Sequence, residues 1–331
     1  MGAVVAAVVA FTVTSVLGIW MIPYLRRLKY GQSIKEIGPI WHKAKQGTPV
    51  MGGLMFIVGI VLAVVVVLLF FPNFQFGQIR GERSKVIYGL LMALMFGLIG
   101  FADDYIKVVK KRNLGLTAKQ KFFLQILAAI IFLALEFSAG NQETTMMVPF
   151  TTLHIPRIFY YPLALFIIVG TVNAVNLTDG VDGLAASVTT VVAIALMLSS
   201  KIMQYTCFAA VSAALAGGCL GFLVWNFHPA KIFMGDTGSL FLGGLICAVA
   251  FGIGAPLLLV PFGVIYICEV LSDIIQVISF KSTGKRVFKM APIHHHFEMS
   301  GWSEMKIVVV FTTITLVTST AGIVWLLLQF Q

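Results

Sequence analysis

The chain has 331 residues, of which 59% are hydrophobic and 11% are charged. Soluble domains carry about 25% charged residues, so this composition excludes a soluble enzyme, a disordered chain and a coiled coil. The net charge of +10 comes from 23 Lys and Arg against 13 Asp and Glu; in a membrane protein such an excess marks cytoplasmic loops, and we expect no nucleic-acid partner.

Ten stretches are apolar enough to cross a bilayer as helices, for which about 20 residues are needed. The sequence therefore predicts an all-α, polytopic integral membrane protein, with one membrane domain over residues 1–331. No basic segment precedes the first stretch, so we interpret it as a retained span and not as a signal peptide. The predicted spans are 3–25, 50–71, 84–102, 122–137, 160–177, 184–200, 205–224, 239–254, 256–279 and 306–328.

Basic residues are distributed unequally between the two sides of this predicted membrane domain. Of the 23 Lys and Arg, 18 fall in the connections that follow the odd-numbered spans, and 5 fall on the opposite side. The positive-inside rule places the basic connections in the cytoplasm. Both termini are therefore predicted on the extracytoplasmic side.

Acidic and histidine residues are scarce, and four groups of them fall on the predicted cytoplasmic face. Asp103 and Asp104 end the third span, and a run of three histidines, His294 to His296, lies in the last cytoplasmic connection. Ionisable residues at membrane depth are candidates for function by default. Three consecutive histidines cannot all face one ion from a regular helix, so phosphate binding or acid–base chemistry suits them better than zinc.

The third cytoplasmic connection carries a polar residue at every third position. This spacing places the side chains on one face of a helix or tight turn, and Gly180 and Gly183 let the backbone approach a ligand. The polar residues of this series are Asn173, Asn176, Asp179 and Asp182.

Asp236 stands just before the eighth span, where it is either a helix N-cap or a metal ligand. Thr237 and Ser239 are further candidates for the cap. Carboxylates without cysteine or clustered nitrogen ligands suit a hard cation such as Mg²⁺, which is usually shared with substrate phosphates. Lysines on the same face could neutralise a pyrophosphate: Lys45, Lys107, Lys111, Lys119 and Lys121.

Two acidic residues lie deeper in the predicted membrane. Glu269 and Asp273 are four residues apart in the ninth span, so they share one helix face. They could form a proton or ion path, or they could line a catalytic cavity. A secondary transporter is therefore the alternative from another functional class.

These motifs together resemble the polyprenyl-phosphate N-acetylhexosamine-1-phosphate transferases. The run Pro292 to Glu298 resembles the branch that transfers a muramoyl-pentapeptide, whereas its relatives transfer GlcNAc-1-phosphate. The matching stretches cover most of the chain: 45–49, 51–53, 101–107, 116–121, 173–183, 226–239 and 291–298.

The resemblance implies a reaction, its partners and a location. Phospho-N-acetylmuramoyl-pentapeptide would pass from UDP-N-acetylmuramoyl-pentapeptide to undecaprenyl phosphate, with Mg²⁺, giving lipid I and UMP. The alternative within the family is transfer of GlcNAc-1-phosphate. The resemblance also implies a homodimer surrounded by membrane lipid in the bacterial inner membrane, and a bent ninth span beside a groove for the lipid tail.

Site residues follow from the same resemblance. It implies that Asp236 binds Mg²⁺ and that Asp103 is a second candidate ligand. The implied catalytic group consists of Asp103, Asp104, Lys107, Asp236, His294, His295 and His296. It also implies that Phe233 stacks on uracil. The implied substrate-binding group consists of Lys45, Thr48, Lys111, Lys119, Asn176, Asp179, Gly180, Asp182, Asn226, Phe233 and Gly235.

Overall fold

The computed structural model describes residues 1–28, 45–71, 81–109, 115–140, 144–148 and 151–330. Within these residues, nine helices are long and apolar enough to cross a membrane. A bent pair, Pro256–Phe262 with Val264–Thr283, forms a tenth candidate span. The predicted class, an all-α polytopic membrane protein, is confirmed.

Each predicted span corresponds to one long helix or to the bent pair. The long helices are α1 (Gly2–Arg27), α2 (Gly53–Phe70), α4 (Glu82–Val109), α5 (Ala118–Ser138), α6 (Arg157–Thr178), α7 (Leu184–Ile202), α8 (Thr206–Asn226), α9 (Gly235–Gly252), α11 (Val264–Thr283) and α13 (Glu304–Gln329). The shorter elements are β1 (Thr145–Val148), β2 (Thr151–His154), η2 (Pro256–Leu258), α10 (Leu259–Phe262) and α12 (Ile293–Glu298).

Helices α8 and α9 form the centre of the bundle, and they are the most buried of the candidate spans in the described residues. Glycines allow their neighbours to approach closely, as small residues do in membrane helix interfaces. A Cβ on Gly217 of α8 would lie 2.1 Å from the carbonyl oxygen of Ala7 in α1, and one on Gly53 of α2 would lie 2.3 Å from Cα of Gly238 in α9. Backbone therefore packs on backbone around the core.

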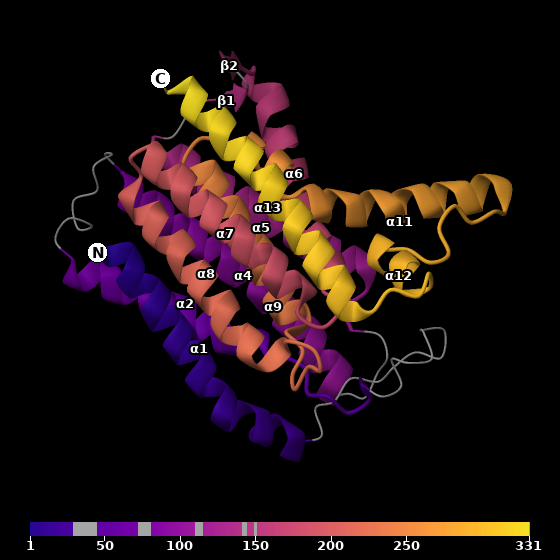
Figure 1. Cartoon of the computed structure of the whole chain (residues 1–331). Helices are drawn as coiled ribbons and strands as arrows, with labels where there is room; N and C mark the ends of the chain where they lie inside the picture. The colour runs from indigo at the N-terminus through magenta and orange to yellow at the C-terminus, as the bar shows by residue number, and fades with distance from the viewer. Residues whose placement is uncertain (29–44, 72–80, 110–114, 141–143, 149–150, 331) are drawn as a thin grey trace.

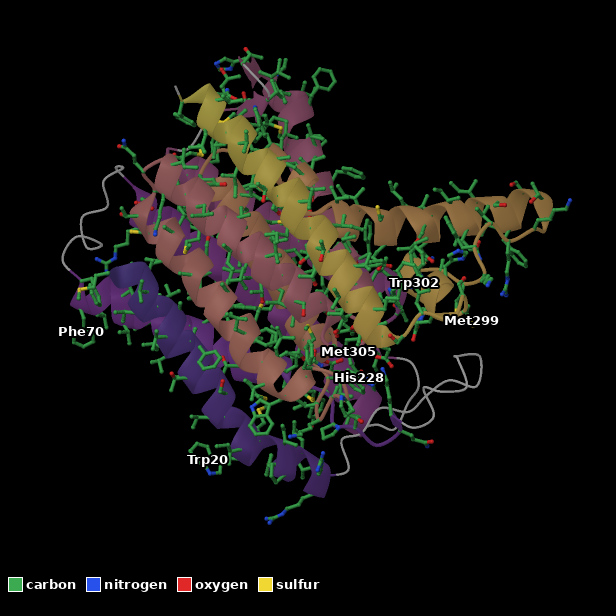
Figure 2. All side chains as sticks on the ribbon, viewed as in Figure 1. Trp20, Phe70, His228, Met299, Trp302 and Met305 are labelled. Atoms are coloured by element: carbon green, nitrogen blue, oxygen red, sulfur yellow. The ribbon has the colours of Figure 1, made fainter. Side chains whose placement is uncertain are left out.

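The two termini lie at the same end of the bundle (Figure 1). His228 and Met305 lie near the opposite end (Figure 2). A shared end agrees with an even number of spans. The assignment of that end to the extracytoplasmic side stays a prediction.

Helix α11 projects away from the bundle, with α12 beside it (Figure 1). The two parts of this span meet at an angle of 82°, and the break falls at Gly263 between α10 and α11. The bend that the resemblance implied for the ninth span is therefore present. It carries α11 out toward the loop that leads to the three histidines.

Strands β1 and β2 form a short antiparallel hairpin, in which Val148 pairs with Thr151. This hairpin is absent from the all-α fold predicted from the sequence. Threonine and valine favour extended backbone, but a run of four residues is too short to show a clear alternation. The hairpin lies near the C-terminal end of α13 (Figure 1), away from the groups described next.

Candidate active site

Helix α4 continues beyond the acidic pair that was expected to end it. The predicted span stops at residue 102, whereas α4 extends to Val109. Lys107 therefore lies one helical turn after Asp103 and on the same face. Its Nζ is 2.5 Å from Oδ2 of Asp103 and 3.0 Å from Oδ2 of Asp236.

Asp236 is the meeting point of four helices. Its Oδ2 contacts Nζ of Lys107 in α4 and, at 2.9 Å, Nζ of Lys121 in α5. Its Oδ1 accepts a hydrogen bond of 2.8 Å from Nδ2 of Asn176 in α6, and the same amide donates to Ser239 of α9. Two ammonium groups and an amide thus hold one carboxylate at the start of α9.

Asp104 caps helix α9 from a different helix. Its Oδ2 accepts from the backbone N–H and the hydroxyl of Thr237, at 2.9 and 2.6 Å, and its Oδ1 accepts from the N–H of Asp236 at 3.2 Å. The N-cap alternative for Asp236, with Thr237 and Ser239 as further candidates, is therefore wrong. The metal-ligand alternative stays a prediction. A helix N-terminus attracts negative charge, and here the charge comes from α4. Asp104 therefore positions Asp236.

Backbone conformation supports this arrangement at Gly235. Its φ is +71°, a region that side chains other than glycine rarely adopt. A Cβ at Gly235 would also lie 2.5 Å from Oδ2 of Asp104. Gly235 therefore turns the chain into α9 above the capping carboxylate. Its place in the substrate-binding group stays a prediction.

Three carboxylates in this group could hold a cation. One oxygen from each of Asp103, Asp104 and Asp236 lies within 4.8 Å of the others. Hard oxygen ligands of this kind suit Mg²⁺. Lys107 and Lys121 balance part of the charge of these carboxylates, as expected where several acidic groups attract cations.

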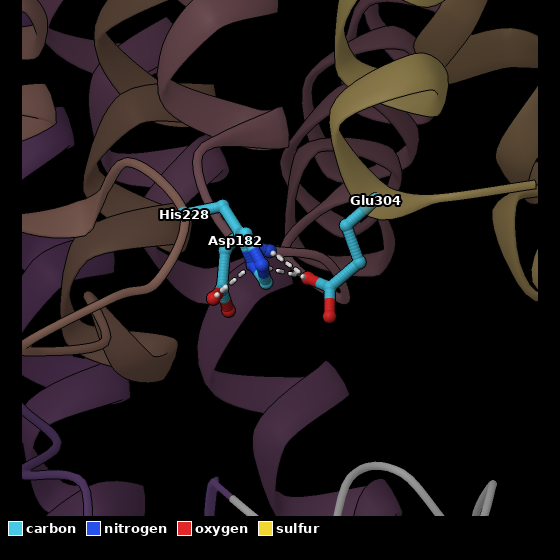
Figure 3. Close-up of side chains that lie close together, drawn as sticks. All are labelled: Asp182, His228 and Glu304. Carbon is cyan, nitrogen blue, oxygen red and sulfur yellow. Dashed lines mark hydrogen bonds and ion pairs between the residues drawn. The ribbon is translucent and has the colours of Figure 1, made fainter.

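A second polar cluster surrounds Asp182, and Figure 3 shows three of its members. His228 Nδ1 lies 3.1 Å from Oδ2 of Asp182, and Glu304 at the start of α13 accepts from the Asp182 backbone N–H at 3.1 Å. Nζ of Lys45 bridges the two carboxylates, at 2.7 Å from Asp182 and 2.6 Å from Glu304. His228 and Glu304 are not among the site residues predicted from the sequence.

The polar series of the third cytoplasmic connection divides among different surroundings. Asn173 exchanges hydrogen bonds of 2.7 and 3.3 Å with Gln125 of α5, Asn176 reaches Asp236, and Asp182 belongs to the second cluster. Helix α6 ends at Thr178, so the spacing of three residues does not continue along one face. The expectation of one shared face was wrong.

Asp179 follows α6 directly and lies between the two acidic clusters. Burial raises the pKa of this carboxyl well above its ordinary value, and the charges of Asp236, Asp104 and Asp182 raise the pKa further. Lys45 acts in the opposite direction, with a smaller effect. A carboxyl in such surroundings favours its protonated form.

The three histidines make three different contacts. Nδ1 of His294 lies 3.0 Å from Oε2 of Glu269, and Nδ1 of His295 lies 2.6 Å from Oε2 of Glu298. Nδ1 of His296 accepts from the backbone N–H of Lys289 at 3.1 Å. The rings therefore do not converge on one point, in keeping with the expectation from their spacing.

Several residues of the predicted substrate-binding group shape the backbone. Asn226 is buried and joins two loops, since it accepts from the N–H of Gly183 at 3.1 Å and donates to the carbonyl of Ile232 at 2.9 Å. The N–H of Phe233 donates to the carbonyl of Pro49 at 2.8 Å. Thr48, partly buried, lies one residue before Pro49. Thr48, Asn226 and Phe233, three members of the predicted substrate-binding group, therefore lie where the segments around residues 48, 183 and 232 meet, which we call the junction at Phe233.

The predicted lysines differ in position. Lys119 lies exposed in the first turn of α5, whereas Lys121 contacts Asp236. Thr117 and Gln120 form a capping box that fixes the start of α5 and thus the direction of both lysines. Lys111 lies outside the described residues.

We expect Lys121→Ala to lower the turnover number by about 100-fold, because it removes one of two ammonium groups beside Asp236. Lys119→Ala, on the exposed side of the same helix, should lower it far less. Steady-state rates of both purified variants, at equal amounts of folded protein, measure the difference. Equal losses in the two variants would contradict the orientation of α5.

Comparison with known proteins gives close relatives over almost the whole chain. Residues 86–253 match the glycosyl transferase family 4. The chain is 49% identical over 319 residues to a phospho-N-acetylmuramoyl-pentapeptide-transferase of Heliobacterium modesticaldum, with 96% of each chain covered. Proteins of the same name from Halalkalibacterium halodurans and Bacillus cytotoxicus are 47% and 46% identical, over 96% and 98% of this chain and 97% and 99% of theirs.

Proposed function

We propose a reaction mechanism for this site from one premise: the chain belongs to the phospho-N-acetylmuramoyl-pentapeptide transferase family. The enzyme transfers phospho-N-acetylmuramoyl-pentapeptide from its UDP donor to a polyprenyl phosphate, and it makes lipid I for peptidoglycan. We propose undecaprenyl phosphate as the acceptor and UMP as the other product. The observation that supports our assignment of the site is the group at Asp236, where four helices bring carboxylates, ammonium groups and an amide together.

The main chemical problem is to bring two anions together. The acceptor is a phosphate monoester with a second pKa of about 6, so it is largely a dianion at neutral pH and a competent nucleophile. Lys107 and Lys121 supply positive charge where the diphosphate of the donor would lie, and they stabilise negative charge that develops on its oxygens. Attack by an acceptor oxygen on the sugar-proximal phosphorus forms one P–O bond. The P–O bond to UMP breaks, and UMP leaves with the electron pair.

Mg²⁺ is the proposed cofactor, with Asp236 as its principal ligand and Asp103 as the second. When bound, such an ion polarises phosphoryl oxygens and screens their charge. Asp104 keeps Asp236 in place by capping α9, and Asn176 fixes the orientation of its carboxylate. In the route with direct attack, Asp103 orients the acceptor; a phosphoryl-aspartate intermediate is the alternative, and trapping one without acceptor would refute direct attack.

The second cluster and the junction at Phe233 are the proposed region for the nucleotide. Asp182, Lys45 and Glu304 offer charged and hydrogen-bonding groups next to the turn that follows α6. Phe233 is partly buried at the same junction, where its ring could stack on uracil. We also propose one membrane domain over residues 1–331, a homodimer and the bacterial inner membrane as the location, with the site on the cytoplasmic face.

An assay of UMP release tests the function directly. Purified protein is supplied with undecaprenyl phosphate, Mg²⁺ and either UDP-N-acetylmuramoyl-pentapeptide or UDP-GlcNAc. We expect release with the first nucleotide and not with the second. Release with UDP-GlcNAc would favour the other branch of the family, and flux across vesicles without UMP release would favour a transporter.

Asp179 should make stability depend on pH. Its pKa is higher in the folded chain than in the unfolded chain, so the folded state binds more protons and its stability falls as pH rises above about 4. Asp179→Asn resembles the protonated acid and lacks this loss. Thermal unfolding of both proteins in metal-free detergent, from pH 5 to pH 8, should show a steeper decline for the native chain; parallel curves would contradict the raised pKa.

A further inference from the structure

A buried carboxylate and imidazole join the projecting helix α11 to the short helix α12. The exposed fractions of Glu269 and His294 are 0% and 1%. Oε2 of Glu269 lies 3.0 Å from Nδ1 of His294 and also accepts from the His294 backbone N–H at 3.4 Å. Buried polar groups are retained where they are paired and hydrogen-bonded. Glu269 therefore fixes both the ring and the first turn of α12.

The other ring nitrogen of His294 faces the turn after α6. Nε2 is buried and has no hydrogen-bond partner among the described residues. A Cβ built on Gly180 would lie 2.1 Å from Nε2, so the ring occupies the space that a side chain at Gly180 would need. Gly180 lies between Asp179 and Asp182, which places Nε2 beside the turn that connects the two polar clusters.

The unpartnered Nε2 lies beside the turn that connects the two polar clusters, which makes it a candidate contact for a ligand. A buried donor or acceptor without a partner costs folding free energy, and a bound molecule would supply the missing hydrogen bond. With Nδ1 directed to a carboxylate, Nε2 is the nitrogen left for that molecule. A carboxylate on one side of an imidazole and a phosphate oxygen on the other is the arrangement in which both ring N–H groups donate.

We propose that Glu269 is a positioning residue of the transferase, which holds His294 so that Nε2 hydrogen-bonds a phosphate oxygen of the sugar nucleotide. The inference rests on the proposed function. It also gives a role to Glu269, the fully buried carboxyl group of α11. The sequence allowed two interpretations of this residue, as part of a proton or ion path or as lining of a catalytic cavity. Glu269 acts through His294, as carboxylates behind a ligating histidine do in other enzymes.

A double-mutant cycle tests this role. UMP release and thermal unfolding are measured for the full-length protein, Glu269→Gln, His294→Gln and the double variant. We expect Glu269→Gln to lower kcat by about 10-fold to 100-fold, with the KM for the sugar nucleotide changed by less than about 3-fold. The double variant should be no slower than His294→Gln alone, because Glu269 has no route to the substrate once His294 is gone.

Glu82→Gln is the matched control. Glu82 is also 0% exposed, and it accepts from the backbone N–H groups of Cys207 and Phe208 at 2.7 and 3.1 Å. It lies 21 residues before Asp103 in α4, which is about 32 Å along the helix. This variant should keep a kcat within about 2-fold of the native value per folded molecule, since it changes an equally buried carboxyl group far from the site.

Each other outcome decides against the inference. Losses that multiply in the double variant, or a folded Glu269→Gln protein with native kcat, would assign Glu269 a structural role only. A lower unfolding temperature with unchanged kcat per folded molecule would do the same. If the native protein releases no UMP with either sugar nucleotide, the proposed function fails, and the inference fails with it.

Discussion

Replacing Asp236 by Asn should reduce turnover on the order of 1,000-fold or more while the helices stay folded. The carboxylate faces Nζ of Lys107 and of Lys121, and it is the proposed principal ligand of Mg²⁺. A carboxamide has nearly the same shape, and its oxygen can still accept from Asn176. The change therefore removes charge and leaves the packing of α9 in place. UMP release across a range of Mg²⁺ concentrations measures the loss.

The same variant separates the metal site from a purely structural cluster. Thermal unfolding of the native protein should respond to added Mg²⁺, because a ligand that binds only the folded state raises its stability. That response should be smaller in Asp236→Asn. Ser239→Ala is a suitable control, since it keeps every charge and removes one hydrogen bond to Asn176. Native activity in Asp236→Asn would exclude Asp236 from the site.

Most of the fold could be predicted because a bilayer imposes a length on each span. About 20 apolar residues are needed to cross it, and all ten predicted stretches meet a helix or the bent pair. The ends were less predictable. The third apolar stretch ends at the first charges, yet α4 continues to Val109, because the chain stays helical after it leaves the apolar core. The position of Lys107 beside Asp103 depends on that extension.

The candidate site was only partly predictable, since its contacts join distant parts of the chain. Scarce acids in a membrane protein pointed to Asp103 and Asp236. Glu304 lies 122 residues after Asp182 in the chain, and nothing in the sequence alone predicts that it contacts the Asp182 backbone. The choice between Lys119 and Lys121 also depends on the rotation of α5, which its capping box and neighbours determine.

The close packing of α4 on α9 brings Asp103 and Asp236 together, and a side chain at Gly100 should disrupt it. A Cβ on Gly100 would lie 2.1 Å from the carbonyl oxygen of Asp236 and 2.5 Å from the amide nitrogen of Thr237. These atoms are backbone, so they cannot move aside as a flexible side chain would. Gly100→Ala should therefore push the start of α9 away from α4, with a cost of about 1–3 kcal/mol in stability.

Activity should fall further than stability in this variant, because a displacement of about 1 Å at a catalytic group costs on the order of 100-fold in rate. Gly97→Ala, one turn earlier in α4, is the matched control: its Cβ would lie 3.3 Å from the side chain of Phe241, a contact that a small shift relieves. We expect UMP release to stay near the native rate in Gly97→Ala and to be largely lost in folded Gly100→Ala. Equal activity of the two variants would show that the spacing of α4 and α9 does not position Asp236.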